Sequence, residues 1–186
     1  MTDLTSHFIK KNIRRFEGYT GQCPRQVSSL KTIVKSETIL SIMEIGFNAG
    51  HSSQLFLTTN TKANVVSFDI GSHDYLHVGK EYIDKTFPDR HQLFLGNSLT
   101  TVPNYIQENP GKTFDFIFID GGHDYETVKN DLECCAEVVD NGGTILCDDY
   151  NLSYAPGVKK AIDEFVIKKN YKCEILLNSR FARIEK

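Results

Sequence analysis

The chain has 186 residues, which is enough for one domain with a substantial core and short for two. Hydrophobic residues make up 40% and charged residues 24%, and the formal net charge of -3 disfavours a nucleic-acid partner. The sequence has no apolar run of signal-peptide or membrane-span length, and its five cysteines form no C-x-x-C spacing. We therefore expect a cytoplasmic protein with free thiols and no membrane partner.

Short apolar runs alternate with helical patterns along the chain. The expected strands cover residues 39–46, 64–70, 92–95, 114–120 and 143–148, and then 172–177 and 180–184. The expected helices cover residues 51–59, 80–87, 100–108, 125–139 and 157–169. Because the five internal strands are apolar with little alternation, helices are expected on both faces of the sheet. This order predicts an α/β fold: a single doubly wound domain with a mostly parallel sheet and a C-terminal antiparallel hairpin.

The first expected strand runs into a turn with two glycines, Gly46 and Gly50. Ligands of doubly wound sheets bind beyond the carboxyl ends of the strands, and glycine lets a ligand approach the backbone closely. The turn has neither the G-x-G-x-x-G spacing of dinucleotide sites nor the G-K-[ST] ending of a P-loop. The carboxylate of Glu44 would repel phosphate and suits a ligand with an ammonium group. A bare strand-to-helix turn remains the alternative.

Polar residues also follow the next two strands. Asp69 lies about 20 residues after the glycine turn, where an acid can accept both hydroxyl groups of a ribose. The alternative for Asp69 is a solvated loop aspartate. Asn97 and Ser98 follow the third strand, but both residue types are also common in turns and helix caps.

Three aspartates follow the fourth and fifth strands, namely Asp120, Asp148 and Asp149. Neighbouring strands lie about 4.8 Å apart, so these carboxylates would crowd at one rim and need a cation or shared protons. Oxygen clusters of this kind suit Mg²⁺, although one acid could cap a helix while another is solvated. His123 lies three residues after Asp120, and its imidazole could take a proton from a substrate hydroxyl; a surface loop histidine is the alternative.

Together these segments resemble the small-molecule O-methyltransferases of the class I superfamily. The methyltransferase-24 group is the most similar, and the macrocin and catechol O-methyltransferase families are relatives. The segments are MEIGFNAGHSS, VVSFD, LGNS, FIFIDGGHDYETVKNDL, GGTILCDDY and PGVKKAIDEF. The resemblance implies a Rossmann-like enzyme that transfers a methyl group from S-adenosyl-L-methionine to a hydroxyl of a small-molecule substrate, assisted by Mg²⁺.

The resemblance also implies roles for individual residues. The cofactor-binding residues would be Glu44, Gly46, Phe47, Asn48, Gly50, Ser52, Asp69, Asn97, Ser98, Asp120 and Tyr125. Asp120, Asp148 and Asp149 would hold the metal, and His123 and Asp120 would be catalytic. In catechol O-methyltransferases a lysine base stands where this chain has His123, and many methyltransferase-24 sequences have histidine where Asp148 stands. Residues 1–35 are left as an N-terminal helical lid, and residues 36–186 form the methyltransferase domain.

Several alternatives stay open. The chain could be a non-catalytic module that binds S-adenosylmethionine or a partner, or a metal-independent methyltransferase. Tyr125 and Lys129 match the Y-x-x-x-K pair of short-chain dehydrogenases, but the T-G-x-x-x-G-x-G loop is missing. A base-amino methyltransferase often has [DN]-P-P-[YFW] where this chain has D-G-G-H. The protein could also form a homodimer.

Overall fold

The computed structural model of the chain describes residues 3–16 and 23–186. The helices are α1 (Leu4–Lys10), α2 (Pro24–Val34), α3 (His51–Thr59), α4 (Leu76–Thr86), α5 (Ser98–Glu108), α6 (Tyr125–Val138) and α7 (Pro156–Lys169). The strands are β1 (Ser41–Ile45), β2 (Asn64–Asp69), β3 (His91–Leu95), β4 (Phe114–Ile119), β5 (Val139–Cys147), β6 (Lys172–Leu176) and β7 (Phe181–Glu185). None of the helices in these described ranges is long and apolar enough to cross a membrane.

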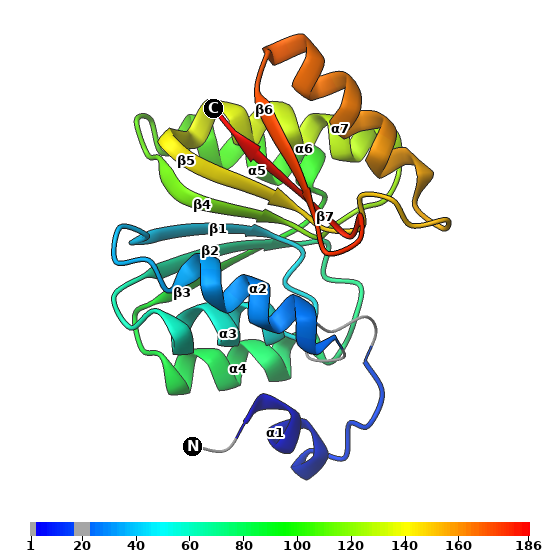
Figure 1. Cartoon of the computed structure of the whole chain (residues 1–186). Coiled ribbons are helices and arrows are strands. Elements are labelled where there is room, and N and C mark those ends of the chain that lie inside the picture. The colour runs from blue at the N-terminus through cyan, green and yellow to red at the C-terminus, as the bar shows by residue number, and fades with distance from the viewer. Residues whose placement is uncertain (1–2, 17–22) are drawn as a thin grey trace.

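The strands form one seven-stranded sheet in the order β3-β2-β1-β4-β5-β7-β6. Strands β1 to β5 run parallel, whereas β7 pairs antiparallel with both β5 and β6. Helices α2, α3 and α4 cover one face of the sheet and α5, α6 and α7 cover the other (Figure 1). The predicted doubly wound α/β fold with a C-terminal antiparallel hairpin is therefore confirmed. The strand order reverses between β1 and β4, which is where ligands bind in such sheets.

The two faces of β4 explain why its sequence, FDFIFI, has no polar face. Phe116 and Phe118 pack into the core on the side of α2–α4, and Ile117 and Ile119 pack into the core on the side of α5–α7. A central parallel strand is buried on both faces, so alternation between apolar and polar residues disappears.

The expected elements lie close to the observed ones. Helix α3 has the predicted bounds, and the side chain of Asp124 accepts a hydrogen bond from the backbone N–H of Thr127 at 3.0 Å, which caps α6 as its residue type suggests. Helix α4 begins at Leu76, earlier than predicted, and β5 begins at Val139.

The N-terminal helices pack against the domain through apolar side chains. Leu4 and Phe8 of α1 and Leu30 and Val34 of α2 are fully buried in the core on the side of α2–α4. The lid function predicted for residues 1–35 stays a prediction, and part of that range, residues 1–2 and 17–22, lies outside the described residues.

Candidate functional site

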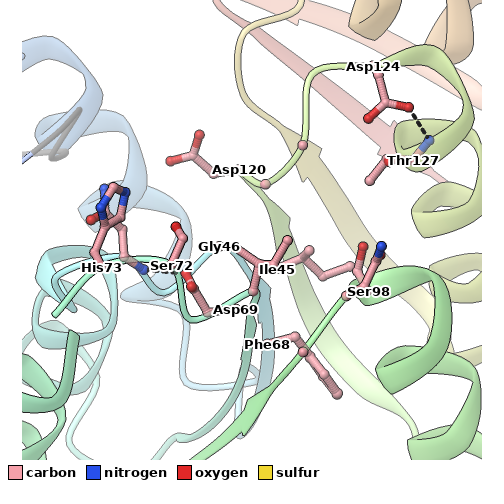
Figure 2. Close-up of a pocket in the computed structure, with 16 residues that line it drawn as sticks. Ile45, Gly46, Phe68, Asp69, Ser72, His73, Ser98, Asp120, Asp124 and Thr127 are labelled. Atoms are coloured by element: carbon pink, nitrogen blue, oxygen red, sulfur yellow. Dashed lines mark hydrogen bonds between the residues drawn. The ribbon is translucent and has the colours of Figure 1, made fainter.

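A cavity of about 390 Å³ opens at the carboxyl ends of β1 to β4, where the strand order reverses. This volume is within the range of small-molecule sites. The lining residues are Ile45, Gly46, Asn48, Phe68, Asp69, Ile70, Ser72, His73, Gly96, Asn97, Ser98, Asp120, Gly121, Gly122, Asp124 and Thr127. Figure 2 shows that they come from the loops after four different strands and from the start of α6.

The glycine turn after β1 allows the ends of β1 and β4 to approach each other. Gly46 has a φ of +101°, and a Cβ atom built on it would lie 2.0 Å from the carbonyl oxygen of Asp120. Gly50 has a φ of +86°, and a Cβ there would lie 2.7 Å from the ring of Phe47. Both positions therefore need glycine for backbone geometry as well as for space.

Asp69 lies at the end of β2 and faces the cavity (Figure 2). One carboxylate oxygen, Oδ2, accepts from the backbone N–H of Asn48 at 2.7 Å, and the other accepts from the N–H of Gly71 at 2.8 Å. An ionised carboxylate offers about four lone-pair sites, so each oxygen retains capacity for a further donor. The next residue, Ile70, is 66% exposed and adds an apolar surface to the same wall.

The structure divides the predicted cofactor-binding residues into two groups. Those that line the cavity are Gly46, Asn48, Asp69, Asn97, Ser98 and Asp120. Those outside the lining are Glu44, Phe47, Gly50, Ser52 and Tyr125. The hydroxyl of Tyr125 donates instead to Glu164 of α7 at 2.5 Å.

Glu44 belongs to a buried polar cluster beneath the turn. Its Oε2 accepts from the hydroxyl of Ser53 at 2.5 Å and from that of Ser67 at 2.6 Å, and Ser67 Oγ lies 2.9 Å from His91 Nε2. Burial raises the pKa of Glu44, and burial lowers the pKa of His91 to about 3. These contacts join three strands to α3, so Glu44 supports the turn from below.

Asp120 lines the cavity at the end of β4 (Figure 2). Burial raises its pKa well above the usual range, and the negative charges of Asp148 and Asp149 raise it further. The three predicted rim aspartates are therefore close enough to interact electrostatically. The positive charge of Arg180 acts in the opposite direction and lowers the pKa of Asp120. A further positive charge near Asp120 would favour its ionised form.

Asp148 is almost completely enclosed by protein donors. Arg180 Nε donates to its Oδ1, which also accepts the backbone N–H of Asp149 at 2.7 Å. Its Oδ2 accepts from Arg180 Nη2 at 3.0 Å and from Gln26 Nε2 at 2.9 Å. Both oxygens are thus occupied, and helix α2 reaches the site through Gln26.

Both carboxylate oxygens of Asp149 also have protein partners. Its Oδ1 lies 2.8 Å from Arg180 Nη2 and accepts from the hydroxyl of Tyr154 at 3.2 Å. Its Oδ2 lies 2.8 Å from Nε2 of His123, whose side chain is 44% exposed. The predicted catalytic histidine is therefore oriented by a buried carboxylate, and the ring of Tyr154 lies beside it at a centroid distance of 5.6 Å.

The predicted magnesium site does not fit this geometry. In residues 3–16 and 23–186, no group of three or more His, Cys, Asp or Glu side chains is arranged to hold a metal ion. In addition, Arg180 forms ion pairs with both Asp148 and Asp149. The assignment of Asp120, Asp148 and Asp149 as metal ligands is therefore not supported by the arrangement of these side chains, and it stays a prediction. Sequence reasoning missed Gln26, Tyr154 and Arg180, because no local pattern connects them to the aspartates.

Comparison with known proteins identifies the family. The family model for methyltransferase-24, described as a methyltransferase domain, matches residues 43–150, which is more than half of the chain. The chain belongs to the methyltransferase-24 family. The match includes the glycine turn, Asp69 and the rim aspartates of this methyltransferase-24 domain, whereas Gln26 and Arg180 lie outside it.

One curated relative is the uncharacterised protein R132 of Acanthamoeba polyphaga mimivirus, which is 33% identical over 109 residues. The match covers 58% of this chain and 42% of that protein, so the chain spans less than half of the length of this relative.

Solved structures establish the fold of this methyltransferase-24 chain. The apo structure of CalS11, a TDP-rhamnose 3'-O-methyltransferase, has a TM-score of 0.72 at 22% identity, covering 88% of this chain and 80% of that one. An O-methyltransferase from Bacillus cereus in complex with S-adenosylhomocysteine has a TM-score of 0.74 at 17% identity, covering 98% and 89%. The S-adenosylhomocysteine-bound methyltransferase PaMTH1 of Podospora anserina has a TM-score of 0.73 at 21% identity, covering 100% and 88%. The fold is that of class I S-adenosylmethionine-dependent methyltransferases.

Proposed function

We propose that this protein is an S-adenosylmethionine-dependent O-methyltransferase that acts on a hydroxyl of a small molecule. The observation that carries the proposal is the cavity where the strand order reverses, which is lined by Gly46, Asp69 and Asp120. Asp120 also lines a small neighbouring pocket together with the paired residues Asp149 and His123. Such a cavity at the carboxyl ends of parallel strands is suited to a nucleoside-containing ligand.

The nucleoside half of the cofactor fits the wall formed by the loops after β2 and β3. The remaining lone pairs of Asp69 would accept the ribose hydroxyls. Ile70 and Phe68 offer apolar surface to a purine ring, and Ser98 offers a hydroxyl at the same end of the cavity. This arrangement supports the predicted roles of Asp69 and Ser98.

The amino-acid half fits the opposite wall, where Gly46 and Asn48 meet the end of β4. An ammonium group near Asp120 would offset the repulsion from the neighbouring aspartates, and Asp120 would then be held as a carboxylate. When bound, S-adenosylmethionine supplies a methyl group that is already activated by the sulfonium charge.

His123 is the proposed base. Because the carboxylate of Asp149 can only accept, the proton of neutral His123 lies on Nε2 in this contact and Nδ1 keeps its lone pair. Nδ1 would accept the proton of the substrate hydroxyl. The exposed ring of Tyr154 beside His123 gives the substrate a surface to pack against. Mg²⁺ is left out of this mechanism because the rim aspartates are bound to Arg180.

The test is methyl transfer from S-adenosylmethionine with a labelled methyl group to a panel of sugar and phenolic hydroxyl compounds, in the presence of EDTA. With an acceptor that the wild type methylates, His123→Gln should lower the rate roughly 10²-fold to 10⁴-fold, because the general base is lost. His77→Gln, on an exposed position of α4, is the matched control and should keep the wild-type rate. Full turnover by His123→Gln would remove the proposed base. Cofactor binding without transfer to any compound of the panel would favour the non-catalytic binding module.

A further inference from the structure

Arg180 lies directly before β7, in the turn that joins β6 to β7. Its backbone is fixed, because its N–H donates to the carbonyl of Leu176 at 3.1 Å and its carbonyl accepts from the N–H of Tyr150 at 3.0 Å. The antiparallel hairpin thereby holds the Arg180 side chain at the carboxyl end of β5. The guanidinium contacts both Asp148 and Asp149.

All four carboxylate oxygens of Asp148 and Asp149 have protein donors. Three of these oxygens contact Arg180, and the fourth, Asp149 Oδ2, contacts His123. A magnesium ion needs free oxygen ligands at about 2.0–2.1 Å in octahedral geometry. The carboxylates cannot meet that need while the guanidinium is bound.

The charges explain why a cation is needed at this place. Asp148 and Asp149 are 5% and 4% exposed, and two adjacent buried carboxylates are unstable without a positive partner. Arginine is always protonated in proteins, and its planar fork binds carboxylates at two points. Arg180 therefore supplies a permanent positive charge that belongs to the chain itself.

We propose that Arg180 takes the place of a divalent cation at the carboxyl ends of β4 and β5, and that it positions His123 by fixing the carboxylate of Asp149. The first part is independent of the reaction, whereas the role of His123 rests on the proposed function. Arg180 is in this view a positioning residue, and the protein needs no divalent ion at this rim.

The experiment titrates the protein with Mn²⁺, followed by electron paramagnetic resonance of the free ion, and repeats the titration with Mg²⁺ by calorimetry. Wild type should bind neither ion at the rim. Arg180→Ala frees the two carboxylates and should gain a single site for Mn²⁺ and Mg²⁺. Near-saturating Mg²⁺ should then raise the melting temperature of Arg180→Ala by roughly 5 °C, with no rise for wild type. Arg183→Ala is the matched control, because Arg183 on β7 pairs with Glu174 and Glu185 instead.

A wild-type protein that binds one Mn²⁺ and loses it in Asp149→Asn would overturn the proposal, and this arm needs no arginine variant to fold. A folded Arg180→Ala that gains no ion site would also overturn it. The positioning role is read from the imidazole nitrogens of His123 by NMR. Wild type should show the tautomer with the proton on Nε2, and Arg180→Ala should show a mixture; an unchanged tautomer would contradict that role.

Binding of S-adenosylhomocysteine, measured in parallel, separates the two proposals. If wild type fails to bind it, the proposed function fails, while the ion titrations still decide whether Arg180 occupies the cation position.

Discussion

Gly46 shows at the scale of one residue how the glycine turn serves both the sheet and the cavity. Its positive φ disfavours a side chain, and a Cβ atom there would lie only 2.0 Å from the carbonyl oxygen of Asp120. We expect Gly46→Ala to lower the free energy of unfolding by about 3 kcal/mol, through backbone strain and the clash. Gly111→Ala is the control, because Gly111 has a φ of +80° and a Cβ there meets no atom within 4 Å.

The control should lose only about 1 kcal/mol, which is the part due to strain. Urea unfolding of both variants measures the difference. Equal losses would mean that the close approach between the ends of β1 and β4 does not constrain this position.

The residues of the site differ in how far the sequence could predict them. That Gly46, Asp69 and Asn97 line one cavity could be predicted, because each lies at or just after the carboxyl end of a parallel strand and these ends meet at one edge of the sheet. Gln26 and Arg180 could not, since they are 122 and 32 residues away from Asp148, the carboxylate that they bind. For the same reason, the acids at the rim predicted a magnesium site from the sequence, whereas the structure shows a guanidinium bound to two of them.

At the scale of elements, the buried cluster beneath the glycine turn joins β1, β2 and β3 to α3. His91 contributes from β3, and burial, with a smaller effect of the charge of Lys80, lowers its pKa from 6.5 to about 3. Between these values the unfolded chain binds a proton and the folded protein does not, so this group reduces stability as the pH falls. The raised pKa of Glu44 has the opposite effect, because it increases stability as the pH falls. Glu44 is present in wild type and in His91→Gln, so its effect is largely removed when the two proteins are compared.

We therefore expect the free energy of unfolding of wild type, relative to His91→Gln, to fall by about 3 kcal/mol between pH 7 and pH 4. Urea unfolding of the two proteins at both pH values measures this change. A difference between them that stays constant with pH would contradict a neutral, buried His91.

Most elements could be predicted because their apolar patterns are long and separated by turn residues. Helix α3 lies within the predicted bounds, and Asp124 begins α6 as its capping residue type suggests. The early start of α4 at Leu76 was not predicted from periodicity. The first turn of this helix packs closely against the domain, because Leu76 is buried and a Cβ on Gly79 would lie 2.2 Å from the carbonyl oxygen of Ala49.

At the scale of the whole molecule, the reversal of the strand order places the cavity and the acidic rim side by side. The hairpin of β6 and β7 then adds Arg180, and α2 adds Gln26, from two parts of the chain outside the family match. Segments far apart in the sequence therefore complete one site.

Calorimetric titration with S-adenosylhomocysteine, run once with EDTA and once with Mg²⁺, shows whether the protein binds this cofactor product without a metal ion. We expect binding of one molecule per chain with the same affinity in both conditions. Asp69→Ala should bind roughly 10-fold to 100-fold more weakly, because the ribose hydroxyls lose a charged acceptor, and Asp84→Ala, on the exposed surface of α4, should bind like wild type. Absence of binding by wild type in both conditions would contradict the proposed S-adenosylmethionine-dependent function.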